Sequence, residues 1–189
     1  NPQPPSTPAQ SMTTPNVELT KEMLMQSLHL LKKYVSVMAI ETRKNYINVV
    51  LVELIEKSND PRVLRAIIQL LDNWFKMKSF ENEPSNREKV LLIQKLTYHI
   101  ENRFSSDSAL NIQFLDLIYF IYSDSDLNTM ELTSNLDRAF LAGLRSSQHD
   151  IRQKFYKLFD DSVSRNFYDR LLYILSTKAW DSIGRHYWI

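Results

Sequence analysis

Apolar residues recur at helical spacing along most of this chain. From Asn16 onward they fall three and four residues apart, as in a helix with one buried face. The pattern predicts helices over 17–38, 41–57, 61–77, 86–104, 107–123, 129–146, 149–163 and 166–177, and a further helix beginning near Trp180. Short polar loops separate these segments, so neighbouring helices are expected to run antiparallel.

Local signals at the helix starts agree with this periodicity. Asp60 is a good N-cap residue, and Pro61 suits the first helical position that follows it. Ser85 and Glu88 have the spacing of a capping box. These signals place two helix starts independently of the apolar pattern.

For three of the predicted helices, the apolar pattern also predicts how they are buried. The helix over 107–123 has two apolar stripes, so we expect neighbours to pack on both of its sides. In the helix over 41–57 the residues expected to be buried together are Ile47, Val50, Leu51 and Leu54. In the helix over 166–177 they are Phe167, Leu171, Ile174 and Leu175.

Taken as pairs, the helices begin near residues 17, 61, 107 and 149. This spacing of about 42–46 residues lies in the range of HEAT and armadillo repeats. The strings DPRVLRAIIQLL from Asp60 and HDIRQKFYKLF from His149 resemble one another, each with an apolar residue followed by Arg. We therefore predict an all-α fold without a sheet, a HEAT/armadillo-like α-solenoid of about four antiparallel helix pairs. A closed eight-helix bundle is the alternative.

The first 16 residues differ from the rest. Five of the seven prolines lie here, together with Ser, Thr and Gln and without a charged residue. Such a segment buries too little apolar surface to offset its ordering entropy. We expect a disordered Pro-rich linker over 1–16 and a repeat segment over 17–189, cut from a much longer chain.

Composition excludes several classes of site. Two glycines and no cysteine leave out glycine-rich phosphate loops, disulfides, thiolate metal sites and cysteine nucleophiles. Lys and Arg number 23 and Asp and Glu 22, a net charge of +1 that gives no reason to expect direct binding to nucleic acid or a membrane. We predict no catalytic residues, no metal and no cofactor.

The segment 124–128 is the sharpest false lead. Its Asp, Asp and Asn match positions 1, 3 and 5 of a calcium-binding EF-hand loop, but Thr129 and Asn135 replace the Gly and Glu that the loop requires. A turn between helices explains the same residues, with Asn128 and Glu131 at capping-box spacing. None of the histidines has metal-ligand spacing; they are His29, His99, His149 and His186.

Basic residues in two parts of the chain could contribute to a binding surface. In 145–170 they alternate with aromatic residues, as at nucleic-acid sites, but nearby aspartates make a solvated face the favoured interpretation. Bases that could edge an apolar groove for an acidic peptide are Lys32, Lys33, Arg43 and Arg152. No partner-binding residue is assigned from the sequence beyond this hypothesis.

Eight strings in order and spacing carry a family resemblance: ETRKNYI (41–47), LIEKSNDPRVLRA (54–66), REKVLLIQKLTYHIENRF (87–104), LNIQFLDLIY (110–119), ELTSNLDRAFLAGLR (131–145), IRQKFYKLFDDS (151–162), RLLYILS (170–176) and GRHYWI (184–189). Over about 17–189 the chain resembles the transformation/transcription domain-associated protein family. These are pseudokinase scaffolds related to phosphatidylinositol-3-kinase-like kinases.

The resemblance implies a piece of the HEAT-repeat body of a nuclear coactivator subunit without kinase activity. Members of this family are shared subunits of the SAGA coactivator and of a MYST-type histone acetyltransferase complex. They link transcription activators to those acetyltransferases. The implied function is a non-catalytic scaffold, not an enzyme. The alternative is a regulatory repeat segment of an active kinase of the same superfamily. A self-contained helical enzyme is a third class, and it would need a polar cluster that the sequence does not show.

Overall fold

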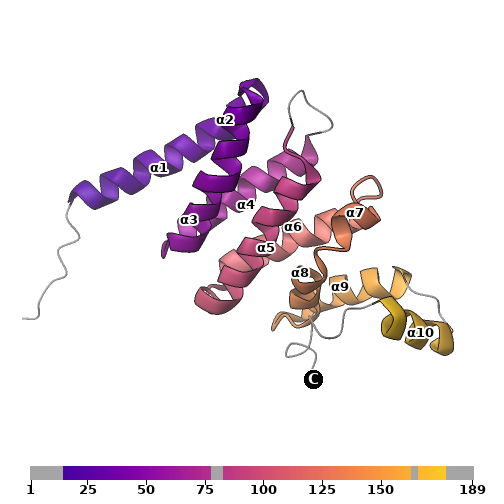
Figure 1. Ribbon diagram of the computed structural model, residues 1–189. Coiled ribbons are helices and arrows are strands. Elements are labelled where there is room, and N and C mark those ends of the chain that lie inside the picture. Colours follow the sequence, from indigo (N-terminus) through magenta and orange to yellow (C-terminus); the bar gives the residue numbers. More distant parts are fainter. Residues whose placement is uncertain (1–14, 78–82, 163–165, 178–189) are drawn as a thin grey trace, which may run out of the picture.

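The computed structural model describes residues 15–77, 83–162 and 166–177, and every regular element in these ranges is a helix (Figure 1). The elements are α1 Pro15–Tyr34, η1 Val35–Val37, α2 Ile40–Asn45, η2 Tyr46–Leu51, α3 Val52–Lys57, α4 Pro61–Lys76, α5 Asn86–Arg103, α6 Ser108–Ser123, α7 Met130–Thr133, α8 Asp137–Leu144, α9 His149–Ser162 and α10 Phe167–Thr177.

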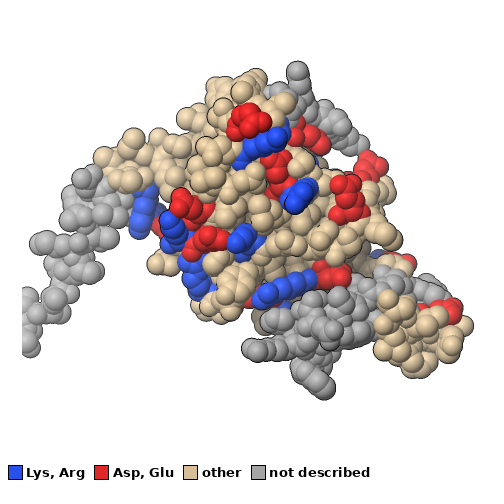
Figure 2. Space-filling model, viewed as in Figure 1, with Lys and Arg blue, Asp and Glu red and all other residues tan. Residues whose placement is uncertain are grey.

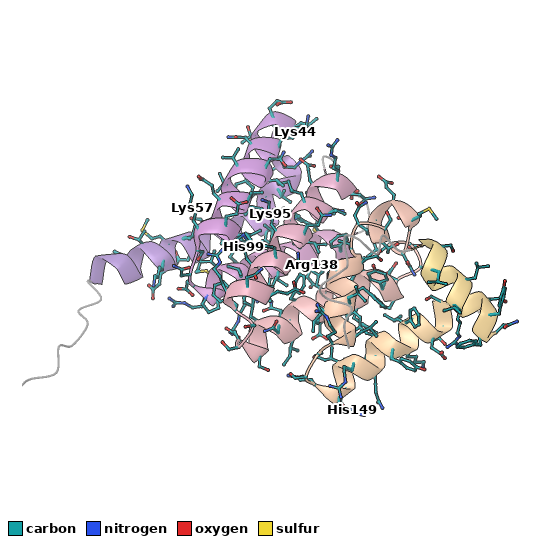
Figure 3. The ribbon with its side chains drawn as sticks, turned by 60° about the horizontal axis from the view of Figure 1, so that its bottom comes forward. Lys44, Lys57, Lys95, His99, Arg138 and His149 are labelled. Carbon is teal, nitrogen blue, oxygen red and sulfur yellow. The ribbon has the colours of Figure 1, made fainter. Side chains whose placement is uncertain are left out.

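The helices form two layers that run side by side along the molecule. In the first layer α1 packs on α4, α4 on α6, and α6 on α9. In the second, α3 packs on α5, and α5 on α7 and α8. Figures 1 and 3 place α1 and α10 at opposite ends of this array. The fold is therefore an open α-solenoid of four helix pairs, as predicted, and the closed bundle is wrong.

The apolar core runs through both layers without interruption. The apolar stripe of α4 is buried throughout, from Val63 to Phe75. The helix α6 contacts α4 on one side and α8 and α9 on another, which confirms its two-sided packing. Its second stripe contributes Tyr119, whose ring lies 6.0 Å from that of Phe155 in α9.

The two helix starts predicted from local signals are confirmed. The Asp60 carboxylate accepts a hydrogen bond of 2.9 Å from the backbone N–H of Arg62, with Pro61 at the first helical position. At α5, Ser85 Oγ accepts from the Glu88 N–H, and the Glu88 carboxylate accepts from the Ser85 N–H. Each cap satisfies backbone donors that the helix itself leaves without partners.

Replacing Ser85 with alanine is expected to cost about 1 kcal/mol of the free energy of unfolding, because the N-cap oxygen is lost. Urea unfolding followed by circular dichroism measures this. The matched control is Ser27→Ala, since Ser27 Oγ is exposed and donates to the Met23 carbonyl within α1. That change should be neutral within about 0.5 kcal/mol. Equal losses in the two variants would contradict the capping role.

The helix over 40–57 contains a π-helical segment that the sequence pattern did not reveal. Tyr46–Leu51 follows a π-helical hydrogen-bonding pattern between α2 and α3. This wider turn keeps residues four apart on one side, so Ile47, Leu51 and Ile55 are the buried residues. The prediction that Val50 is buried is wrong: it is 40% exposed, and Leu54 is only partly buried.

The single helix predicted over 129–146 is wrong, because α7 and α8 are separated by a break at 134–136. The Thr133 carbonyl accepts from the Leu136 N–H and from the Tyr122 hydroxyl. Gln94 of α5 donates to the Asn135 carbonyl. Partners from α5 and α6 thus hold these carbonyls outside a continuous helix.

The predicted cap at Asn128 is also wrong. Thr129 is the N-cap of α7 and makes no side-chain capping bond. The Asn128 side chain donates instead to the Tyr122 carbonyl at the end of α6. Asn128 therefore closes the preceding helix and does not begin the next one.

At the ends of the chain the structure departs from expectation in two ways. The helix α1 begins at Pro15, within the predicted linker, while residues 1–14 and the helix expected near Trp180 lie outside the described residues. In α10 the expected buried face is exposed at Phe167, Leu171 and Leu175, and the side chain of Ile174 lies outside the described residues. An ion pair of 2.6 Å between Arg170 and Asp160 connects α10 to α9.

Candidate interaction surfaces

Ion pairs connect the first three helix pairs within the first layer. Lys21 of α1 lies 3.7 Å from Asp60, the N-cap of α4. Arg65 of α4 donates at 2.8 Å to Asp107, the N-cap of α6. Each carboxylate thus caps one helix and binds a base from the preceding pair. We call these contacts the first ion-pair row.

The second layer has a corresponding row. Lys95 of α5 binds Glu56 of α3. Glu101, 45 residues after Glu56, accepts from Arg138 of α8 at 2.6 Å and from Arg145 at 3.1 Å. Figure 3 shows Lys95 and Arg138 following one another across this layer. We call these contacts the second ion-pair row.

Backbone contacts reinforce the second row. Arg103 at the end of α5 donates to the carbonyls of Ile55 and Glu56, at 2.8 and 2.6 Å. These carbonyls belong to the last turn of α3, where helical partners are absent. His99 Nδ1 lies 2.6 Å from the Arg103 guanidinium, and burial followed by this charge lowers the His99 pKa. His99 is therefore a structural residue, as its lack of metal-ligand spacing indicates.

The titration of the row carboxylates follows from these contacts. The pKa of Asp107 is held below its usual 3.8, first by the Leu110 backbone N–H and then by Arg65. The pKa of Asp60 is lowered chiefly by its bonds to Arg62. That of Glu56 is lowered by Lys95. All three carboxylates are consequently ionised at neutral pH, in the state that the rows require.

A groove of about 550 Å³ lies between the α5–α6 and α8–α9 connections. Its apolar floor includes Ile100, Phe114 and Ile151. Its edges combine Arg138, Arg145 and Glu101 with five serines, namely Ser105, Ser106, Ser108, Ser146 and Ser147. Two guanidinium groups share one carboxylate here, so the edge holds an excess of positive charge. We call this the serine groove.

A second groove of about 540 Å³ lies at the C-terminal ends of α4 and α6, beside α7. Aromatic side chains of Trp74, Phe75 and Phe120 line it, and four carboxylates stand at its edge, from Glu83, Asp124, Asp126 and Glu131. Figure 2 shows acidic side chains gathered at the upper right, over the end of α6 and over α7. We call this the acidic groove.

A shallower groove of about 430 Å³ follows the contact between α4 and α6. Its charged residues are paired: Lys76 with Asp72 at 2.8 Å, and Asp116 with Lys154 at 3.9 Å. Lys76 also lies over the Phe120 ring, 5.3 Å from its centre. With its charges balanced locally, this groove favours neither sign of ligand.

The bases expected to edge a groove are not brought together. Arg43 is buried in α2 at 6% exposure. Arg152 lies in α9 and donates to the Ser146 and Ser147 carbonyls, so it holds a loop in place. Lys32 is partly buried in α1, and the Lys33 side chain lies outside the described part of the chain. The sequence missed Arg138 and Arg145, which share Glu101.

The other candidate motifs resolve as ordinary structure. Asp124 Oδ1 accepts from the backbone of Asp126 and Leu127, which makes 124–128 the expected turn between helices. His99 and His149 lie well apart in Figure 3. Across 15–77, 83–162 and 166–177, no three His, Asp or Glu residues are placed to hold a metal ion. Nor does any helix in these ranges have the length and apolar character needed to cross a membrane.

The basic residues within 145–170 have acidic partners wherever the structure describes their ion pairs. Arg145 binds Glu101, Lys154 lies near Asp116, and Arg170 binds Asp160. A nucleic-acid site would instead present unpaired bases along a stripe. Arg152 bonds backbone carbonyls instead, and Lys157 is exposed, so the solvated face stays a prediction.

Two layers of helix pairs, joined at intervals of about 40 residues by the ion-pair rows, define a HEAT-type repeat segment. The model of the family described as the Tra1 HEAT repeat ring region matches residues 1–189. The chain belongs to this family, which confirms the resemblance found in the sequence. It is a helical-repeat segment of the transcription-associated Tra1 type.

Relatives agree over most of the chain. A Danio rerio protein named Transformation/transcription domain-associated protein is 46% identical over 175 residues, 90% of this chain. The Homo sapiens protein of that name is 44% identical over 184 residues, 96% of the chain. A Schizosaccharomyces pombe protein named SAGA complex/NuA4 acetyltransferase complex subunit Tra1 is 36% identical over 149 residues, 79% of the chain. The chain spans only 4–5% of the length of these relatives.

Proposed function

We propose that this chain is a non-catalytic scaffold segment of a nuclear transcription coactivator subunit, and that it links activators to histone acetyltransferase complexes of the SAGA and MYST types. The name of the Schizosaccharomyces pombe relative, a SAGA and NuA4 complex subunit, supports membership in such complexes. The alternative is a repeat segment that regulates an active kinase of the same superfamily. The relatives' names, which refer to transcription, favour the scaffold.

The ion-pair rows are the observation that carries the scaffold proposal. Lys95, Arg138 and Arg145 all bind carboxylates of the preceding helix pair. Charged side chains that a catalytic site would use for chemistry thus hold successive repeats in register. Repeats stacked in this way leave extended faces for partners.

The serine groove is the surface that best suits an acidic activator. Acidic activation segments of transcription factors combine carboxylates with bulky apolar residues. The groove offers an apolar floor for the latter and two guanidinium groups for the former. Buried apolar contacts would supply most of the affinity, and the charges would mainly raise the association rate.

Two variants of one charge cluster test this assignment. Replacing Arg138 and Arg145 together with glutamine removes both cations and should weaken binding of a labelled acidic-apolar peptide about tenfold at low salt. Replacing Glu101 with glutamine breaks the same ion pairs but removes a competing carboxylate, so it should strengthen binding. Fluorescence anisotropy titrations at two salt concentrations measure both.

Opposite shifts in the two variants separate charge recognition from structural damage. Thermal melts by circular dichroism check that both variants fold. Weakening in both, or no saturable binding by the parent chain at either salt, would remove the activator from this segment and leave a purely architectural role. Phosphotransfer or acetyl transfer by the purified chain would overturn the non-catalytic assignment. A salt-dependent filter-binding assay tests the expected lack of nucleic-acid affinity.

A further inference from the structure

The acidic groove combines aromatic and acidic side chains, and the activator proposal assigns no ligand to it. It is formed where α4 ends, where α5 begins, and along the turn from α6 into α7. Its four carboxylates face two cations, those of Lys76 and Lys89. Because Lys76 is already paired with Asp72, the groove retains an excess of negative charge.

Two buried donors line this groove. Lys89 is 4% exposed, and its ammonium group lies 5.0 Å from the centre of the Phe75 ring. Desolvation lowers the pKa of Lys89, and the charge of the Glu83 carboxylate opposes this shift. Trp74 is 1% exposed, and its indole Nε1 is buried without a hydrogen-bond partner in the described chain.

A ligand that completes this site has two properties. It brings positive charge to the carboxylates at the edge and hydrogen-bond acceptors to the donors on the walls. A metal ion supplies only the first, and no three carboxylates of the described residues converge on one point. An extended peptide supplies both, since its basic side chains are cations and its backbone carbonyls are acceptors.

We propose that the acidic groove binds an extended peptide of a partner protein in which basic residues flank one or two bulky apolar side chains. The apolar side chains pack against Phe75, Phe120 and Leu132 on the floor. The basic side chains pair with Glu83 and Glu131 at the edge. This surface selects a partner of opposite charge to the one proposed for the serine groove, and it stands independently of that assignment.

Trp74 provides a local reporter of binding. The chain has three tryptophans, so the variant Trp180→Phe/Trp188→Phe leaves Trp74 as the sole indole. The probe is a fluorescein-labelled ten-residue peptide with a central Leu-Phe between pairs of lysines. We expect saturable anisotropy at low salt and, with the unlabelled peptide, a change in Trp74 emission over the same concentration range.

Matched peptides and variants define the outcome. A peptide with glutamate for lysine, and one with Gly-Ser for Leu-Phe, should each bind at least tenfold more weakly. Glu83→Gln/Glu131→Gln should weaken binding of the basic peptide about fivefold or more. The control Glu41→Gln/Glu53→Gln removes two acidic charges from α2 and α3 and should leave binding unchanged. Circular dichroism melts verify folding of each variant.

Several results would overturn the proposal. These are equal binding of the glutamate peptide, equal weakening by the two double variants, and no change in Trp74 emission at saturation. If sedimentation shows that the chain dimerises and that the dimer no longer binds the basic peptide, a second copy occupies the groove and the proposal is wrong.

Discussion

Replacing Gly143 with alanine is expected to destabilise the protein by about 2–3 kcal/mol, although alanine is the better helix former. Gly143 lies in α8, and a methyl group on its Cα would stand 2.5 Å from three ring atoms of Phe155 in α9. The Phe155 ring cannot yield easily, because it is 1% exposed and packs 5.3 Å from the Phe140 ring and 6.0 Å from the Tyr119 ring. The two helices would have to separate.

A double-mutant cycle tests this explanation. Phe155→Leu opens space where the new methyl group would lie, so Gly143→Ala should cost far less in that background than in the parent chain. Urea unfolding of the four proteins gives a coupling energy of at least about 1 kcal/mol in favour of the double variant. Additive losses would show that the close approach of α8 and α9 is not what requires glycine.

Loss of the Asp107 side chain should cost about 2 kcal/mol, because one carboxylate performs two tasks. It accepts the Leu110 backbone N–H at 2.9 Å as the N-cap of α6, and it pairs with Arg65 of the preceding repeat. Asp107→Ala removes both interactions. Asp107→Asn retains capping but loses the charge, so it should cost less than half as much. Equal losses in the two variants would assign the whole effect to the charge.

The pH dependence gives a second check on Asp107. Its pKa in the folded protein lies below the ordinary 3.8, so its ionised form favours folding. That contribution is complete above the ordinary pKa and is lost as the pH falls through the lower, folded value. The stability difference between the parent and Asp107→Asn should therefore be constant near neutral pH and shrink below about pH 4. A difference that grows on acidification would contradict the assignment.

Apolar spacing predicted helices where one face of each is buried by neighbours on a regular α-helical path. The stripe of α4 and the two-sided packing of α6 are of this kind. The capping box at Ser85 was equally readable, because all of its atoms lie within four residues of the chain. In each case the information that fixes the structure is local.

The incorrect predictions concern segments whose structure depends on contacts with other helices or on a departure from regular α-helical geometry. The π-helical segment at Tyr46–Leu51 changes which residues share a face. A helical period of 3.6 residues therefore predicted, wrongly, that Val50 is buried. The break before α8 depends on Tyr122 and Gln94, which come from other helices. No local signal near Ser134 indicates those partners.

The candidate surfaces were the hardest to foresee. The sequence shows that Glu56 and Glu101 have bases around them, but not that each accepts from the next helix pair about 40 residues on. It offered Arg43 as a groove edge, although that side chain is buried. A search for acid–base pairs at the repeat period, rather than at helical spacing, would have found both ion-pair rows.

The ion-pair rows also bear on how the molecule bends. They lie in opposite layers, so bending toward one layer compresses the contacts of its row and stretches those of the other. Salt screens attraction between exposed charges over about 8 Å at physiological ionic strength, and stretched pairs are weakened most. Ionic strength should therefore tune the flexural stiffness of the solenoid, and with it the distance between the surfaces at its two ends, while every helix stays folded.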